Sequence, residues 1–135
     1  MIMKYVFFAV IYIFMVSTVA SASEGNNPSL ESAKLNKLIE LAKEQSSQDE
    51  GQQYWWQVFA KLDKIGDDKL NACFIKKSDP TAMYQYVLEI GALGAIERVY
   101  WEKSDDFTTC IDSVLIGMEL SPPPKSPFYF YLSEI

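Results

Sequence analysis

The sequence contains no histidine. Histidine is the commonest general base and a frequent zinc ligand, so its absence excludes Ser/His and Cys/His nucleophile arrangements and the usual zinc spacings. A glycine-rich phosphate loop, a calcium-loop pattern and internal repeats are also missing from the sequence. We therefore expect a protein that is not an enzyme and that binds no metal and no cofactor.

Basic residues are few. The chain has 12 Lys and Arg against 18 Asp and Glu, a net charge of −6. A charge of this sign repels phosphate backbones and the Lys residues are scattered, so nucleic-acid binding is disfavoured. The acidity suits a protein partner with a basic face.

Residues 1–22 are predicted to be a signal peptide. Lys4 is their only charge, residues 5–16 are continuously apolar, and residues 20–22 fit a small-residue cleavage site. The alternative is an uncleaved membrane anchor, because the run to Ala22 approaches the roughly 18–20 residues of a spanning helix. Cleavage would remove Lys4 and no acid, leaving 11 basic against 18 acidic residues, or −7. We expect a periplasmic or secreted protein with one domain, residues 23–135.

The chain has only two cysteines, Cys73 and Cys110. In an exported chain of this size, the pair predicts one disulfide. The bond would close a loop of about 38 residues and contribute about 4 kcal/mol in the chain-entropy model. The alternative is two buried free thiols.

Apolar spacing predicts an all-α fold, a small bundle of about five helices with one disulfide. The central helix would occupy residues 78–104, because the sequence between Tyr84 and Tyr100 is apolar on nearly every side and such a helix belongs inside a domain. The expected domain also has a flexible leader at residues 23–28 and an extended tail at residues 121–135. The other expected helices cover residues 28–45, 47–65, 67–77 and 104–118.

The predicted disulfide conflicts with a straight central helix. About 25 helical residues span roughly 36 Å, and antiparallel flanking helices would bring each cysteine back by only about 10 Å. Bonded cysteines need Cα atoms within about 7 Å. The central helix is therefore expected to break near Gly91–Gly94.

The C-terminal tail is rich in proline and aromatic residues. Pro122–Pro124 forbid a helix and favour an extended chain. A strand is compatible with the large apolar residues that follow, but their period does not support one. Two interpretations remain, a lid across the core or an exposed segment that docks on a partner. The candidate partner-binding residues here are Phe128, Tyr129, Phe130 and Tyr131.

Adjacent tryptophans mark the second predicted helix. Trp55 and Trp56 point about 100° apart on a helix, so at most one of them can face the core squarely. Trp55 shares the apolar stripe, which makes Trp56 the candidate partner-binding residue. Packing in or at the rim of the core is the alternative for Trp56.

Three charged residues lie within the apolar central stretch: Glu89, Glu97 and Arg98. Buried charges need partners, so these residues are interpreted either as a structural ion pair or as a catalytic dyad. The acidic pairs at residues 67–68 and 105–106 sit where helix-capping acids belong.

In size, export segment, acidity and single disulfide, the chain is similar in general form to the periplasmic immunity proteins that neutralise cell-wall amidases. The resemblance implies an exported, non-enzymatic inhibitor or immunity protein that neutralises a partner such as a cell-wall-degrading effector. The alternatives are an assembly factor, pilotin or chaperone of an envelope secretion or pilus system, and a carrier of an apolar small molecule. No oligomeric state is predicted.

Overall fold

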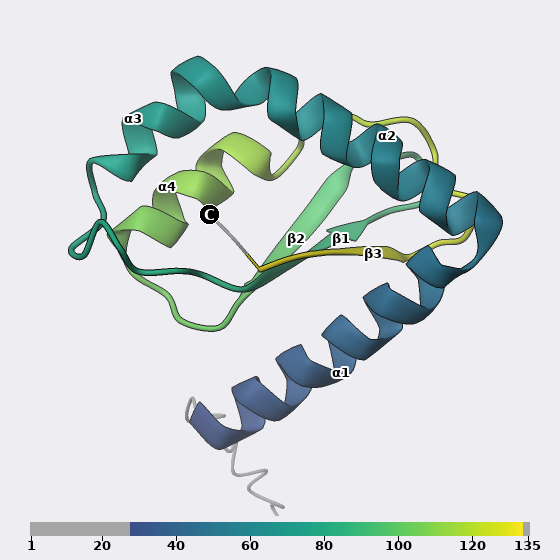
Figure 1. The fold of residues 1–135 in the computed structure, drawn as a ribbon, viewed down its shortest axis with the longest axis horizontal. Helices are drawn as coiled ribbons and strands as arrows, with labels where there is room; N and C mark the ends of the chain where they lie inside the picture. The colour runs from purple at the N-terminus through teal and green to yellow at the C-terminus, as the bar shows by residue number, and fades with distance from the viewer. Residues whose placement is uncertain (1–27, 134–135) are drawn as a thin grey trace, which may run out of the picture.

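The computed structural model describes residues 28–133, and the fold is mixed α/β, not the predicted all-α bundle (Figure 1). A three-stranded antiparallel sheet lies among the helices. The predicted signal peptide and the leader up to residue 27 lie outside the described residues. In chain order, the elements are α1 (Pro28–Ser47), α2 (Asp49–Ile65), the π-helical turn η1 (Gly66–Leu70), α3 (Asn71–Phe74), β1 (Tyr86–Ile90), β2 (Ile96–Trp101), α4 (Asp106–Leu115) and β3 (Phe128–Leu132).

The predicted central helix at residues 78–104 is wrong, because this stretch forms the antiparallel hairpin of β1 and β2. β1 is the middle strand, and Val87, Leu88 and Ile90 are all 0% exposed. A strand buried on both faces has a continuous apolar sequence, which periodicity alone cannot distinguish from a buried helix. The break expected near Gly91–Gly94 coincides with the hairpin turn, where the Gly94 N–H donates to the Gly91 carbonyl.

The molecule has three layers, with the sheet in the middle (Figure 1). The strand order is β2-β1-β3. One face of the sheet packs against α1 through Val87 of β1 and the residues Leu35, Leu38 and Ile39. The other face packs against α2 and α4 and carries the larger part of the core, including Val58, Leu62, Leu88, Phe107 and Ile111.

The aromatic part of the C-terminal tail forms the edge strand β3 of the sheet. β3 pairs antiparallel with β1, with Phe128 opposite Ile90 and Phe130 opposite Leu88. Successive strand residues face opposite sides of the sheet. Phe128 and Phe130 therefore enter the α2 and α4 side of the core, whereas Tyr129 and Tyr131 pack on the α1 side. Both faces of β3 are covered, which explains why its sequence shows no polar alternation.

The outer helices match the sequence prediction closely. α1 begins at Pro28 as expected, and α4 begins after Asp105, whose side chain accepts from the Thr108 N–H. This capping explains the role expected for the acids at residues 105–106. α2 ends at Ile65 as predicted, and η1 and α3 then occupy most of the range expected for the third helix.

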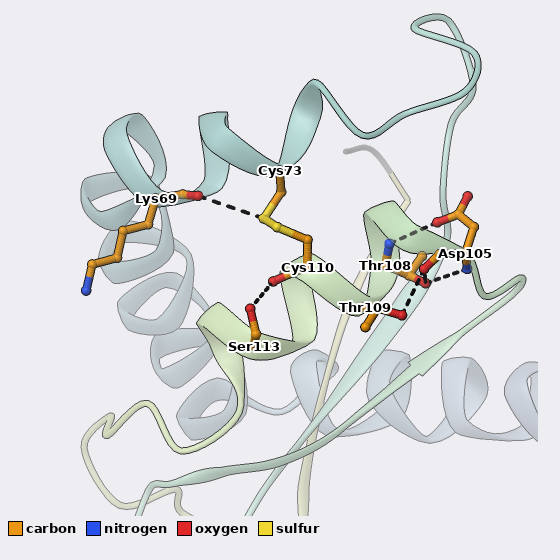
Figure 2. The surroundings of a disulfide bond; sticks show 7 residues. All are labelled: Lys69, Cys73, Asp105, Thr108, Thr109, Cys110 and Ser113. Carbon is orange, nitrogen blue, oxygen red and sulfur yellow. Dashed lines mark hydrogen bonds between the residues drawn. A yellow bond between two sulfur atoms is a disulfide. The ribbon is translucent and has the colours of Figure 1, made fainter.

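The predicted disulfide between Cys73 and Cys110 is confirmed, and the alternative of free thiols is wrong (Figure 2). Their Cα atoms are 5.6 Å apart, and the bond joins α3 to α4 on one side of the sheet. Disulfides persist mainly in oxidising compartments. The bond therefore indicates an extracytoplasmic location.

Candidate protein-binding surface

Trp56 projects from α2 into solvent. The buried residues of this helix include Tyr54, Val58 and Leu62, and Trp56 lies about 200° around the helix from Val58. Its side chain is 59% exposed. Of the two adjacent tryptophans, Trp55 is the one that packs against the core, as the sequence indicates.

Four rings form a continuous row from the core to this surface, here called the aromatic ladder: Phe130, Trp55, Phe59 and Trp56. Trp55 stacks on Phe130 with ring centroids 5.2 Å apart. Phe59 stacks on Trp55 at 5.3 Å with an interplanar angle of 8°. Trp56 meets both Trp55 and Phe59 edge to face, at 5.0 and 5.9 Å. The contacts anchor an exposed aromatic side chain to an edge strand of the sheet.

The outer edge of β3 has no neighbouring strand among residues 28–133. Figure 1 shows β3 running between α1 and α2, which diverge from the corner where they meet. At the start of the strand, the side chain of Gln45 covers this edge. Its Oε1 accepts from the Tyr129 N–H at 2.8 Å, and its Nε2 donates to the Pro127 carbonyl at 2.9 Å.

A cleft of about 550 Å³ opens beside Gln45, and we call it the corner cleft. Its apolar lining includes Leu41, Pro124 and Phe128, and its charged lining consists of Glu44, Glu50 and Lys125. Tyr54 fixes the Pro-rich segment near this site by donating from its hydroxyl to the Ser121 carbonyl at 2.7 Å. Burial raises the pKa of Tyr54 to about 12, so this donor stays protonated in the physiological range.

The predicted partner-binding residues separate into three groups by exposure. Phe128 is 1% exposed and Phe130 is 0% exposed, so these two side chains belong to the core and are not free to dock on a partner. Tyr129 and Tyr131 are half-buried against α1. Trp56 is the exposed member of the predicted set, and the aromatic ladder connects it to Phe130.

Two of the three charged residues of the central stretch are neighbours across the hairpin. Glu89 pairs in register with Arg98, and the Tyr100 hydroxyl donates to Glu89 Oε2 at 2.6 Å. Hydrogen bonding to Tyr100 and the nearby charge of Glu89 raise the pKa of the Arg98 guanidinium. The register thus places Arg98, and not Glu97, opposite Glu89.

Gln45 is the residue of this surface that the sequence did not indicate. A glutamine on a helix belongs to no motif, and its contact partners lie 82 and 84 residues further along the chain. The Gln45 side chain matters because it hydrogen-bonds backbone groups at the start of β3 that no other strand of the described residues pairs with. No signal in the sequence identifies such a contact before the strand itself is known.

Comparison with protein families, curated proteins and solved structures gives no match. Within residues 28–133, no cluster of acidic or cysteine side chains could hold a metal ion. The same residues include no helix that is long and apolar enough to cross a membrane.

Proposed function

We propose that this chain is a periplasmic or secreted, non-enzymatic binding protein that neutralises a partner protein. In this proposal the chain acts as an inhibitor or immunity protein, and a cell-wall-degrading effector is one example of the partner that it would neutralise. The mixed α/β fold gives no support to a helical-bundle architecture for such a protein. Support now comes from the surface of α2.

The observation that carries the proposal is the exposure of Trp56. This side chain is 59% exposed although its ring contacts Trp55 and Phe59 edge to face. Tryptophan and other aromatic residues are enriched at the centres of protein interfaces, where they contribute much of the binding energy. A fixed tryptophan loses little conformational freedom on binding, which favours a role as an anchor.

The experiment compares Trp56→Ala with Leu93→Ala. Leu93 is 87% exposed in the hairpin turn, so it is a control for loss of an exposed apolar side chain that does not belong to α2. The oxidised protein would be used to capture its partner from the envelope fraction of its own cells, and the purified partner would then be titrated with each variant. We expect Trp56→Ala to weaken binding at least ten-fold and Leu93→Ala to leave it unchanged. Equal affinity of all three proteins would overturn the proposal.

A second candidate is an assembly factor, pilotin or chaperone of an envelope secretion or pilus system. The open edge of β3 favours it, because such proteins hold an extended segment of a partner and strand addition is one way to do so. An inhibitor lowers the activity of the captured partner. An assembly factor instead changes the partner's stability or its state of assembly, so an activity assay beside a sedimentation measurement distinguishes the two.

A further inference from the structure

The backbone of β3 points alternately toward β1 and toward solvent. The Tyr129 N–H faces outward, because it donates to Gln45. In an antiparallel ladder the direction repeats every second residue. The N–H and carbonyl of Tyr131 therefore face outward as well, beyond the reach of Gln45, with no neighbouring strand in the described part of the chain.

The contacts of Gln45 indicate what chemistry this edge accepts. A side-chain amide has the same donor and acceptor as a peptide group. Gln45 accepts from one outward N–H and donates to the outward carbonyl two residues earlier, as the carbonyl and N–H of a single residue in an adjacent parallel strand would. The side chain thus stands in for one residue of a missing neighbouring strand, and the edge continues past it at Tyr131.

The residues around the outer edge of β3 indicate which side chains a bound segment would carry. On the α2 side, the aromatic ladder starts at Phe130 of β3 and provides an apolar wall. On the α1 side, the Lys43 ammonium lies 5.6 Å from the centre of the Tyr131 ring. At the start of the strand, the corner cleft offers two carboxylates, Glu44 and Glu50, against one ammonium, Lys125. The cleft therefore favours a basic side chain over an acidic one, in agreement with the net charge of −6.

We infer that the outer edge of β3 binds an extended segment of a partner protein as a fourth strand of the sheet. The segment carries apolar side chains that pack on the aromatic ladder and a basic side chain that enters the corner cleft. Main-chain hydrogen bonds to Tyr131 supply affinity, and the two flanking sites supply selectivity. The inference rests on the proposed function, because it names the way in which a partner would be held.

The probe is a phage-displayed library of ten-residue peptides, panned against the oxidised protein as processed by an exporting host. An enriched peptide would be synthesised with a fluorescent label and titrated by anisotropy. We expect enriched sequences to combine a Lys or Arg with apolar residues at alternate positions. We also expect hydrogen exchange at the Tyr131 amide to slow when the peptide is bound.

The decisive comparison is Tyr131→Pro against Tyr131→Ala. Both variants lose the ring, but only proline removes the outward N–H, which the native sheet does not use. Edge strands tolerate proline at such positions, and circular dichroism would check that both variants fold. We expect the proline variant to bind the peptide at least ten-fold more weakly than the alanine variant.

Three outcomes would overturn the inference: no enriched peptide, equal affinity of the two variants, or a dimer of this chain that Tyr131→Pro dissociates. The last outcome would assign the edge to a second copy of the chain. The proposed function is tested separately, since a partner whose binding depends on Trp56 and not on the Tyr131 N–H would sustain that function and exclude strand addition.

Discussion

The Tyr84 hydroxyl donates to Asp105 Oδ2 at 2.6 Å. Asp105 is also the N-cap of α4, where its other oxygen accepts from the Thr108 N–H at 2.9 Å (Figure 2). One carboxylate therefore holds both the start of α4 and the segment that leads into β1. The connection is electrostatic at both ends, so its strength depends on the ionisation of Asp105.

Acidification should remove this contribution. Desolvation raises the pKa of Asp105, but the hydrogen bonds from Tyr84 and from the backbone N–H groups of Thr108 and Phe107 outweigh it, and the net pKa is lowered. A lowered folded-state pKa gives stability that is present above the unfolded value of about 3.9 and is lost as the pH falls through the folded value. We expect Tyr84→Phe to lower the melting temperature at pH 7 and to have a smaller effect near pH 3. An equal effect at both pH values, measured by thermal unfolding, would contradict this coupling.

Loss of the disulfide should destabilise the domain. Cys73 and Cys110 are separated by 37 residues, and the chain-entropy model gives about 4 kcal/mol for a loop of this size. We expect the double change of Cys73→Ala and Cys110→Ala to lower the free energy of unfolding by about 3–4 kcal/mol in urea titrations. The wild-type protein titrated with a reductant is the control and should approach the variant. An unchanged transition under oxidising conditions would show that the bond contributes nothing to stability.

The outer helices were predictable because each buries only one face. α1 and α2 alternate polar and apolar residues with helical period, and Asp105 is a typical N-cap residue. The exposure of Trp56 also followed from the 100° step between adjacent helical residues. The disulfide followed from the count of cysteines and the export segment.

The sheet was not predictable by the same reasoning. β1 lies between two strands and two helical layers, so nearly all its residues are apolar and no period of two remains. β3 has the same property, because Tyr129 packs toward α1 and Phe130 toward α2. The geometric conflict between a straight helix and the disulfide was nevertheless real. It located the turn at Gly91–Gly94 while misassigning the elements on either side.

Alanine substitutions at two glycines with positive φ should distinguish the cost of backbone strain from the cost of close packing. Gly94 has φ +90° and Gly117 has φ +86°. A Cβ at Gly94 would overlap the Leu120 carbonyl oxygen, a backbone atom that cannot move aside as a flexible side chain could. Nothing lies within 4 Å of a Cβ at Gly117. We expect Gly117→Ala to cost about 1–2 kcal/mol for the left-handed backbone alone. Gly94→Ala should cost more, by about 1–3 kcal/mol of overpacking, and equal costs in chemical denaturation would contradict the assigned contact.

The contact between Gln45 and β3 predicts a specific pattern of hydrogen exchange. Gln45→Ala removes the acceptor of the Tyr129 N–H, so this amide should exchange faster, and stability should fall by about 1 kcal/mol. Gln45→Glu is the matched control, because a carboxylate keeps the acceptor while it loses the donor to the Pro127 carbonyl. Exchange at Tyr129 should stay slow in the glutamate variant. Fast exchange in the wild-type protein would exclude the proposed cover of the edge.

Phe130 tests whether the aromatic tail is part of the core. Its side chain is 0% exposed, stacks on Trp55 and comes from an edge strand that pairs with β1. Truncating a buried phenylalanine typically costs about 3–5 kcal/mol, because the lost burial adds to the cost of the cavity. Trp56→Ala removes a larger but mostly exposed ring and should cost about 1 kcal/mol or less. Equal costs in urea titrations of the two variants would mean that β3 contributes little to the core. A large cost for Phe130→Ala alone would assign this side chain to the core and not to a surface that contacts another protein.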